Sequence, residues 1–262
     1  CIFDNINNFN FINNEDIKIF INNSLQEDIG DGDHTSQACI KNNTNHKAKL
    51  IAKENGIIAG VALAKMIFLH VDNNLKIKTH KEDSEKINIG DVIFEIEGNA
   101  RSILKAERFV LNCMQRMSGI ATYTAYLIRL IKHTETKILD TRKTTPLNRI
   151  IEKWAVRIGG ANNHRYGLYD AIMIKDNHID FSGSITKAIK QTKNYLSKNK
   201  LNIPVIVEAR NLNEVKEILS SEKIDRILLD NFNYQTTIKA VKIINNTCET
   251  ESSGNITDAN IK

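Results

Sequence analysis

The sequence predicts an α/β protein in which a small N-terminal α+β domain precedes the parallel strands of an α/β barrel or a doubly wound sheet. Three observations lead to this prediction: alternating apolar patterns in the first hundred residues, a long helical pattern, and then recurring short strands that end in charged residues. With 262 residues, the chain is long enough for one large barrel or two ordinary domains. We expect the α+β domain over residues 1–101, and the long helix and the parallel strands over 102–262.

The composition and the start of the chain exclude several classes of protein. Hydrophobic residues make up 41% and charged residues 26%, a mix typical of folded globular proteins and not of disordered or fibrous ones. The longest apolar stretch, from Ile57 to Ala64, is too short to cross a bilayer. The start has neither the basic nor the apolar region of a signal peptide. Because it begins at Cys1 rather than Met, we expect a clipped N-terminus, and we expect the Asn-rich residues 1–14 to fray.

The cysteines favour a reducing compartment. Cys1, Cys39, Cys113 and Cys248 lie far apart, and no two have the CxxC spacing of a zinc or redox site. A chain of this size does not need disulfide bonds. We therefore expect free thiols and a cytoplasmic location, with Cys113 in the core or at an interface.

The first hundred residues show both helical and strand patterns. Residues 15–30 are spaced as a helix, and a second helix is expected around 61–70. Alternating segments predict three strands, over 48–52, 75–77 and 92–96. The aspartates around Gly30 look like a metal-binding loop but lack the EF-hand spacing, so we interpret them as a turn that ends the first helix.

A long helix and a series of strands follow. Residues 102–132 have apolar residues at helical spacing, and we expect Gly119 to interrupt this helix. The expected strands cover 137–140, 171–175, 205–208, 226–230 and, more weakly, 248–251. The expected helices between them cover 185–195, 212–219 and 235–244. Five strands are fewer than the eight of a closed barrel, so we expect either that the barrel is incomplete by design or that the chain stops early.

Polar residues collect at the ends of these strands, and parallel strands would bring them to one mouth. They are Asp140, Thr141, Arg142, Lys143, Lys175, Glu208, Asp230, Ser253 and Gly254, with His164 and Arg165 in the loop before the second strand. The cations fit a substrate with several phosphate or carboxylate groups. The sparse carboxylates fit Mg²⁺ held jointly with a diphosphate. These residue types therefore indicate phosphate-ester chemistry.

Basic residues are concentrated in one segment of the chain. Residues 141–178 contain seven Lys or Arg and three acidic residues, so this segment carries a charge of +4 out of the net charge of +5. Lys153 and Arg157 of this segment have a helical setting, and we expect them to be solvated. For His178, contact with substrate and a structural hydrogen bond at a strand end are equally good interpretations.

Motifs in order along the chain resemble those of the quinolinate phosphoribosyltransferase family. They are Glu27–Thr35 (EDIGDGDHT), Glu107–Asn112 (ERFVLN) with Ser118–Thr122 (SGIAT), Asp140–Pro146 (DTRKTTP), Asn163–Asp170 (NHRYGLYD), Ile174–His178 (IKDNH) and Leu229–Phe232 (LDNF). Each motif alone is a weak signal. Together, at these spacings and over nearly the whole chain, they are highly specific.

The resemblance implies an activity and an assembly. The family joins quinolinate to phosphoribosyl pyrophosphate (PRPP), with Mg²⁺, and gives nicotinate mononucleotide, pyrophosphate and CO₂ for NAD synthesis. Its members pair an N-terminal sandwich with an open barrel, and the N-terminal region of one subunit completes the partner's site. The resemblance therefore implies an N-terminal α+β sandwich domain over residues 1–101 and an open, incomplete α/β barrel over 102–262, which explains the low number of strands. We therefore expect a homodimer with shared active sites or a higher oligomer, and no nucleic-acid or membrane partner.

The resemblance also implies which residues bind quinolinate. Quinolinate is a dianion, and a cluster of Arg, Lys and His is the simplest way to hold two adjacent carboxylates. The residues that match the family's pocket are Arg142, His164, Arg165 and Lys175, with Arg108 supplied by the other subunit.

The remaining residues are expected to act on PRPP. Glu208 and Asp230 are candidates for the ribose hydroxyls, for PRPP-bound Mg²⁺ and for the charge that develops when pyrophosphate leaves. Lys143 would hold phosphate oxygens, and Ser253-Gly254-Asn255 would bind the 5′-phosphate. Thr141 completes the substrate-binding set, in which Glu208, Asp230 and Lys143 are the expected catalytic residues.

The chain departs from the family pattern in three loops. Leu147 and Asn148 stand where the family usually has Gly-Leu, and Ala161 stands where it has a third Gly. Asn255 stands where a Gly is common. The chain also ends at Lys262, short of the family's final strand, so we expect a C-terminal strand to be missing.

Alternatives of other classes stay open from the residues alone. A Schiff-base aldolase would also place a lysine, such as Lys143 or Lys175, at a barrel strand end, and borohydride trapping would reveal it. A nucleic-acid-binding module would use the basic segment, but its charges fall at strand ends rather than along one exposed helix. A phosphoribosyltransferase for nicotinate or another base is the nearest rival.

Overall fold

A computed structural model describes residues 13–262 of the chain, which form two compact units that divide between His164 and Arg165. The expected fraying at the Asn-rich start falls mainly on residues 1–12, and these lie outside the described residues, as does Cys1. Asn13 caps the first helix, because its side-chain oxygen accepts a hydrogen bond from the Asp16 N–H at 2.8 Å.

The first unit is built from small antiparallel sheets and from helices. Its helices are α1 (Asn14–Ile29), α2 (His34–Cys39), α3 (Val61–Val71), α4 (Ala100–Ile131) and α5 (Arg149–Ile158). Its strands are β1 (Asn45–Ile51), β2 (Gly56–Ile57), β3 (Lys76–Thr79), β4 (Lys86–Ile87) and β5 (Val92–Asn99). One sheet has the order β1-β5-β3, and β2 pairs with β4. The predicted strands and helices are confirmed, whereas α2, β2 and β4 are too short to show a periodic pattern.

The aspartate-rich turn after α1 is a boundary between helices. Gly30 ends α1 with a φ of 55°, a left-handed conformation that glycine adopts at little cost. Asp33 then begins α2, since its carboxylate accepts a hydrogen bond from the Ser36 N–H at 3.0 Å. Hydrogen bonds from Ser36 lower the pKa of Asp33. The interpretation of this segment as a turn is therefore confirmed.

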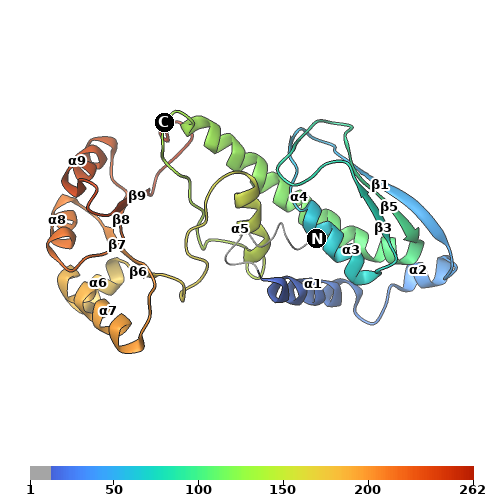
Figure 1. The fold of residues 1–262 in the computed structure, drawn as a ribbon, viewed down its shortest axis with the longest axis horizontal. Coiled ribbons are helices and arrows are strands. Elements are labelled where there is room, and N and C mark those ends of the chain that lie inside the picture. The colour runs from blue at the N-terminus through green and yellow to red at the C-terminus, as the bar shows by residue number, and fades with distance from the viewer. Residues whose placement is uncertain (1–12) are drawn as a thin grey trace. The chain divides into compact units, whose positions relative to one another are not determined.

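The core of the first unit lies between its larger sheet and the helices α3 and α4 (Figure 1). Phe68 of α3 meets Phe94 of β5 edge to face, with 6.0 Å between ring centroids. Cys113 and Met117 of α4 are buried there, as expected, and burial raises the pKa of the Cys113 thiol to about 12. Trp154 adds α5 to the same core.

The division into units follows the burial of α4 and α5. The domain boundary expected from the sequence, between residues 101 and 102, falls at the start of α4. Because α4 and α5 bury their apolar faces in the core of the first unit, both helices stay with the residues that precede them. The compact units therefore divide after His164.

The second unit alternates strands and helices. It consists of β6 (Ile172–Ile174), α6 (Asp176–Ser182), α7 (Ile185–Asn199), β7 (Val205–Ala209), α8 (Leu212–Ser220), β8 (Arg226–Asp230), α9 (Tyr234–Ile244) and β9 (Glu249–Ser253). The strands pair in parallel in the order β6-β7-β8-β9, and the helices lie along one side of the sheet (Figure 1). Among the strands of residues 13–262, β6 and β9 each pair on one side only, so the sheet is open. The predicted α/β class and open architecture are confirmed.

One expected strand is wrong. Residues 137–140 form no strand but a single parallel bridge between Leu139 and Asn162. Only two backbone hydrogen bonds join these segments, from the Asn162 N–H to the Ile138 carbonyl and from the Asp140 N–H to the Asn162 carbonyl. The apolar pattern was present, but the neighbouring segment 162–164 pairs with it too briefly to extend a ladder.

The expected interruption at Gly119 is also wrong. Helix α4 runs unbroken over 32 residues, because its buried face packs along the core and outweighs the weak helix propensity of one glycine. Gly119 itself is exposed. Neither this long helix nor any other in residues 13–262 is apolar enough over its length to span a membrane.

Substitution of Gly119 by alanine should stabilise the first unit. A Cβ at this position meets no atom within 4 Å, and alanine favours a helix interior over glycine by about 1 kcal/mol. We expect the free energy of unfolding, measured with urea, to rise by about that amount. Gly183→Ala is the control and should lower it, since Gly183 ends α6 with a φ of 87°. A loss of stability in Gly119→Ala would contradict this account of α4.

Candidate active site

A buried ion pair lies where the segment with Arg142 and Lys143 begins. Nζ of Lys153, on α5, is 2.5 Å from Oδ1 of Asp140, and the two side chains are 1% and 8% exposed. The expectation that Lys153 is solvated is therefore wrong. Its neighbour one turn on, Arg157, is also not a free surface cation, since it donates to the Ala161 carbonyl at 3.2 Å. Helix α5 packs into the core, and both side chains are used to connect the helix to nearby loops.

Asp140 connects two segments that carry site residues. Its Oδ1 accepts a second hydrogen bond from the His164 N–H at 2.8 Å, and its Oδ2 accepts one from Nδ2 of Asn163 at 2.5 Å. Lys153 in turn donates to the His164 carbonyl at 3.0 Å, and Asn163 donates to the Lys153 carbonyl at 3.0 Å. The position of His164 is thus set by the same carboxylate that precedes Thr141.

A second buried charge on α5 holds the other end of this segment. Glu152 is 7% exposed, and its Oε1 lies 2.7 Å from Nη2 of Arg116 on α4. Its other oxygen accepts a hydrogen bond from the Thr145 N–H at 3.2 Å, and Arg116 also donates to the Thr145 hydroxyl at 3.0 Å. Residues 140–145 are therefore fixed to α5 at both ends.

The predicted cations Arg142 and Lys143 lie between these two ends, and a third predicted cation, Arg108, lies on α4. Arg142 is partly buried, and its Nε has no hydrogen-bond partner among residues 13–262. Lys143 is exposed, and its N–H donates to the Thr141 hydroxyl at 3.0 Å, which closes a tight turn. Arg108 is exposed on α4 and has no ion-pair or hydrogen-bond partner within the described part of the chain. These cations have their charge available for an anionic ligand.

In the second unit, the ends of the strands carry a cation beside a carboxylate. Lys175 follows β6 directly, and its Nζ is 3.4 Å from Oε2 of Glu208 on β7. The Lys175 side chain is 49% exposed and that of Glu208 only 9%, so the carboxylate lies beneath the cation. Nδ1 of His178 accepts a hydrogen bond from the Lys175 N–H at 2.9 Å. Of the two interpretations left open for His178, the structure favours the structural hydrogen bond.

The next two strand ends are joined by amide side chains. Asp230 at the end of β8 pairs in register with Ser253 at the end of β9. Oδ2 of Asp230 accepts a hydrogen bond from Nδ2 of Asn231 at 2.8 Å, and Oδ1 of Asn231 accepts one from Nδ2 of Asn255 at 2.9 Å. The backbone of Gly254 lies against the Asn231 side chain and has a φ of 85°. A Cβ at this position would lie 2.2 Å from Oδ1 of Asn231. Only glycine fits this turn.

Arg165 lies at the start of a loop that is ordered by an acidic side chain. Its Nη1 donates to the Ala171 carbonyl at 3.0 Å, which directs the guanidinium back along its own loop. The carboxylate of Asp170 accepts hydrogen bonds from the N–H groups of Tyr166 at 2.6 Å and of Gly167 at 2.8 Å. The loop that follows His164 is therefore held in a defined conformation.

The predicted site residues fall into two groups. Lys175, Glu208, Asp230 and Ser253 meet at the carboxyl edge of the parallel sheet, as predicted. Asp140, Arg142, Lys143 and His164 belong to the first unit, where Asp140 holds them together. Sequence reasoning missed the supporting residues Arg116, Glu152, Lys153 and Asn231, because nothing in a residue type or its spacing shows that a charged side chain is buried.

The carboxylates are the available ligands for a metal. Within residues 13–262, no three His, Cys, Asp or Glu side chains gather closely enough to hold an ion by themselves. Mg²⁺ commonly takes one or two carboxylates and completes its shell with substrate phosphates and water. Glu208 and Asp230, on neighbouring strands, are a donor set of that kind.

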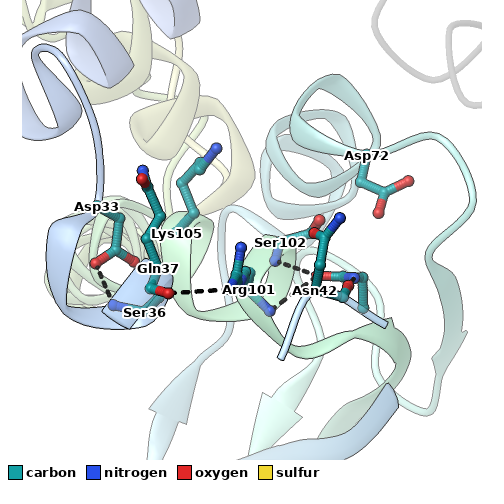
Figure 2. A pocket seen from close by; sticks show the side chains of 9 residues that line it. Asp33, Ser36, Gln37, Asn42, Asp72, Arg101, Ser102 and Lys105 are labelled. Carbon is teal, nitrogen blue, oxygen red and sulfur yellow. Dashed lines mark hydrogen bonds between the residues drawn. The ribbon is translucent and has the colours of Figure 1, made fainter. Parts of the chain in front are cut away.

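A polar pocket in the first unit contains none of the predicted site residues (Figure 2). Its volume is about 310 Å³, and Asp33, Asp72 and Lys105 are among the residues that line it. Arg101, at the start of α4, donates there to the carbonyls of Gln37 and Ile40 and so ties α2 to α4. These hydrogen bonds give the pocket's polar groups a structural role.

Comparisons with known proteins identify the family. Models of the N-terminal and C-terminal domains of quinolinate phosphoribosyl transferase match residues 33–118 and 120–262. The chain is 46% identical over 257 residues to the chloroplastic nicotinate-nucleotide pyrophosphorylase (carboxylating) of Arabidopsis thaliana, which covers 92% of this chain and 73% of that one. It is 42% identical over 246 residues to a probable nicotinate-nucleotide pyrophosphorylase (carboxylating) of Bacillus subtilis, and the match covers 94% of this chain and 83% of that one. The solved structure of the nicotinate-nucleotide pyrophosphorylase from Francisella tularensis is 40% identical in sequence and superposes on this chain with a TM-score of 0.87. The match covers 96% of this chain and 88% of that one.

The fold and the two groups of side chains are those of an α/β enzyme equipped for an anionic substrate. The chain belongs to the quinolinate phosphoribosyltransferase family. This membership decides against the Schiff-base lysine enzyme and the nucleic-acid-binding module as alternatives.

Two departures from the family pattern occupy left-handed backbone positions. Leu147 has a φ of 65° and Asn255 a φ of 57°, at two of the three places where the sequence lacks an expected glycine. Asparagine tolerates this conformation, whereas leucine does so only with strain. The turn at Leu147 is thus retained without glycine at an energetic cost.

Substitution of Leu147 by glycine should stabilise the chain. The side chain is 93% exposed, so little packing is lost, and relief of a left-handed leucine contributes on the order of 1 kcal/mol. We expect a corresponding increase in the free energy of unfolding in urea. Leu168→Gly is the matched control, because Leu168 is also exposed but has no positive φ, and it should not stabilise. Equal losses in both variants would refute strain at Leu147.

Proposed function

We propose that this chain transfers the phosphoribosyl group of PRPP to quinolinate, with loss of CO₂, and so forms nicotinate mononucleotide and pyrophosphate. The family membership supports this activity most directly, since relatives with 42% and 46% identity carry the name of the enzyme. The cations of the first unit and the carboxylates of the second supply the two kinds of group that the reaction needs.

The cationic residues are proposed to bind quinolinate. Arg142, His164, Arg165 and Lys175, with Arg108 of a second subunit, would neutralise the two adjacent carboxylates. The buried Nε of Arg142, which has no partner in the described part of the chain, is the kind of donor that a bound carboxylate would satisfy. Lys175 is already near a carboxylate, that of Glu208, and its exposed amino group can turn toward a second anion.

The carboxylates are proposed to act on the ribosyl group. As pyrophosphate leaves, positive charge develops on the ribose ring, and negative side chains beside it stabilise that transition state. Glu208 and Asp230 lie on adjacent strands, which supports the proposal that they bind the ribose hydroxyls and provide this charge. The same two residues would hold Mg²⁺ together with PRPP, and the ion would supply charge neutralisation for the diphosphate.

The phosphate groups are proposed to bind at two turns. Lys143 has an exposed amino group for phosphate oxygens, and Thr141 shapes its turn. The N–H groups of Gly254 and Asn255 have no acceptor among residues 13–262, so they are available to the 5′-phosphate along with the Ser253 hydroxyl. Close packing of Gly254 against Asn231 keeps this turn in place.

Decarboxylation follows from the chemistry of the product. Ribosylation makes the ring nitrogen cationic, so it stabilises the electron pair that stays on the adjacent ring carbon when the carboxylate leaves as CO₂. That carbon then takes up a proton from solvent, which gives the C–H bond of the product. No further cofactor is needed for this step. A site that excludes water favours it, because desolvation raises the free energy of the carboxylate more than that of neutral CO₂.

The assembly and location are parts of the same proposal. We propose a homodimer in which Arg108 of one subunit serves the other's site. Its guanidinium is exposed and has no partner within residues 13–262, which supports this role. We propose a cytoplasmic location on the basis of the free thiols of Cys39, Cys113 and Cys248. The name of the Arabidopsis relative places that protein in the chloroplast.

Discrimination between quinolinate and nicotinate tests the proposed activity. Nicotinate lacks the second carboxylate, so cations built to bind it would be left unpaired, and nicotinate should be a very poor substrate. We expect kcat/KM for quinolinate to exceed that for nicotinate by about 10⁴-fold, measured as nicotinate mononucleotide formed from each in the presence of PRPP and Mg²⁺. Comparable efficiencies would disprove the quinolinate assignment.

Mixed dimers test the shared site. Arg108→Ala and Lys143→Ala homodimers should each be nearly inactive, because every site then contains one lesion. After the two variants are unfolded and refolded together, about half of the dimers are mixed, and each has one site with both lesions and one with neither. Activity should return to roughly a quarter of wild type. If the mixture stays as inactive as its parents, Arg108 acts within its own chain.

A further inference from the structure

We propose that Lys153 is a positioning residue of the quinolinate pocket, which acts through Asp140 and the main chain of His164. The inference rests on the proposed function, because it concerns the residues assigned there to quinolinate. Lys153 itself is 1% exposed and does not reach substrate.

The contacts of Lys153 connect the two segments that bind the dianion. Its Nζ lies 2.5 Å from Oδ1 of Asp140 and 3.0 Å from the carbonyl oxygen of His164. The same Oδ1 accepts the His164 N–H at 2.8 Å, so the main chain of His164 is held on both its N–H and its carbonyl side. Two residues beyond Asp140 is Arg142, whose buried Nε has no partner in the described chain.

Asn163 leaves this arrangement little freedom. Its Nδ2 donates to Oδ2 of Asp140 at 2.5 Å and to the Lys153 carbonyl at 3.0 Å. Both oxygens of Asp140 are therefore occupied, and the donors come from α5 and from the residues at 163 and 164. A shift of Asp140 would move His164 and the start of the Arg142 segment together.

Stability alone does not explain a buried charge pair here. Apolar residues of similar size commonly replace such pairs without loss of stability, since burial of two charges is costly. A charge pair instead fixes distance and direction, and a misplacement of about 1 Å at a site can lower activity on the order of 10²-fold. The ion pair therefore serves to fix the positions of the groups that bind quinolinate.

The test is a split between the two substrates. Lys153→Met keeps most of the side-chain volume but removes the charge, and the double variant Asp140→Asn/Lys153→Met also removes the carboxylate that would be left unpaired. In both, we expect KM for quinolinate to rise about tenfold or more, while KM for PRPP and kcat change less than about threefold. Calorimetry with quinolinate alone should show a matching loss of affinity. Lys190→Met, an exposed lysine on α7, is the control and should match wild type.

Each outcome decides the proposal. A merely structural role would lower the melting temperature without separating the two KM values, and that result would overturn it, as would wild-type affinity for quinolinate in folded variants. If Lys153→Met does not fold, the double variant carries the test, and failure of both to fold would show that the pair serves folding instead. If the wild type does not turn over quinolinate, the proposed function is wrong, and this outcome is distinct from a failure of the proposal for Lys153, which is measured in the variants.

Discussion

The buried pair of Lys153 and Asp140 is the interaction on which the positions of the Arg142 segment and of His164 depend. Removal of one partner would leave an uncompensated charge in the interior, at a cost on the order of 3–5 kcal/mol. The pair therefore persists only where both side chains are delivered to the same place, by α5 and by the bridge at Leu139. Once formed, it fixes the residues that follow Asp140 and those on either side of His164.

In the second unit, the backbone of the parallel sheet positions the residues at the strand ends. Its parallel strands are held in register by backbone hydrogen bonds, which bring the residues at successive strand ends to one edge of the sheet. Amide side chains then connect the turns: Asn231 bonds to both Asp230 and Asn255. Here the sheet positions the carboxylates, and hydrogen bonds from amide side chains hold the turns that surround them.

Much of this could be predicted from the sequence, because periodicity and strand ends are local signals. The four strands of the second unit, the helix over 102–132 and the grouping of Lys175, Glu208 and Asp230 all follow from patterns within a few residues of each other. The prediction was wrong where tertiary packing decided the outcome. Gly119 is tolerated because α4 packs along a continuous core, and residues 137–140 lack a partner long enough for a strand.

Burial of charge was the other feature beyond the reach of sequence reasoning. Lys153 and Glu152 are adjacent on α5 and look like solvated residues of a helix, yet each pairs with a charge that lies at least 13 positions away in the chain. Their partners could be found only after the fold had brought α4, α5 and residues 140–145 together. Positive φ at Leu147 and Asn255 is likewise invisible in the residue types, and only the comparison with a glycine-containing pattern draws attention to these positions.

The central claim, that this chain couples phosphoribosyl transfer to decarboxylation, is tested most directly by the balance of products. Quinolinate with ¹³C in its 2-carboxylate is incubated with PRPP, Mg²⁺ and the purified protein, and labelled CO₂, pyrophosphate and nucleotide are measured together. The account predicts that the three products form in equal amounts and that the nucleotide is unlabelled nicotinate mononucleotide. Formation of a nucleotide that retains the label, or release of pyrophosphate without CO₂, would contradict it.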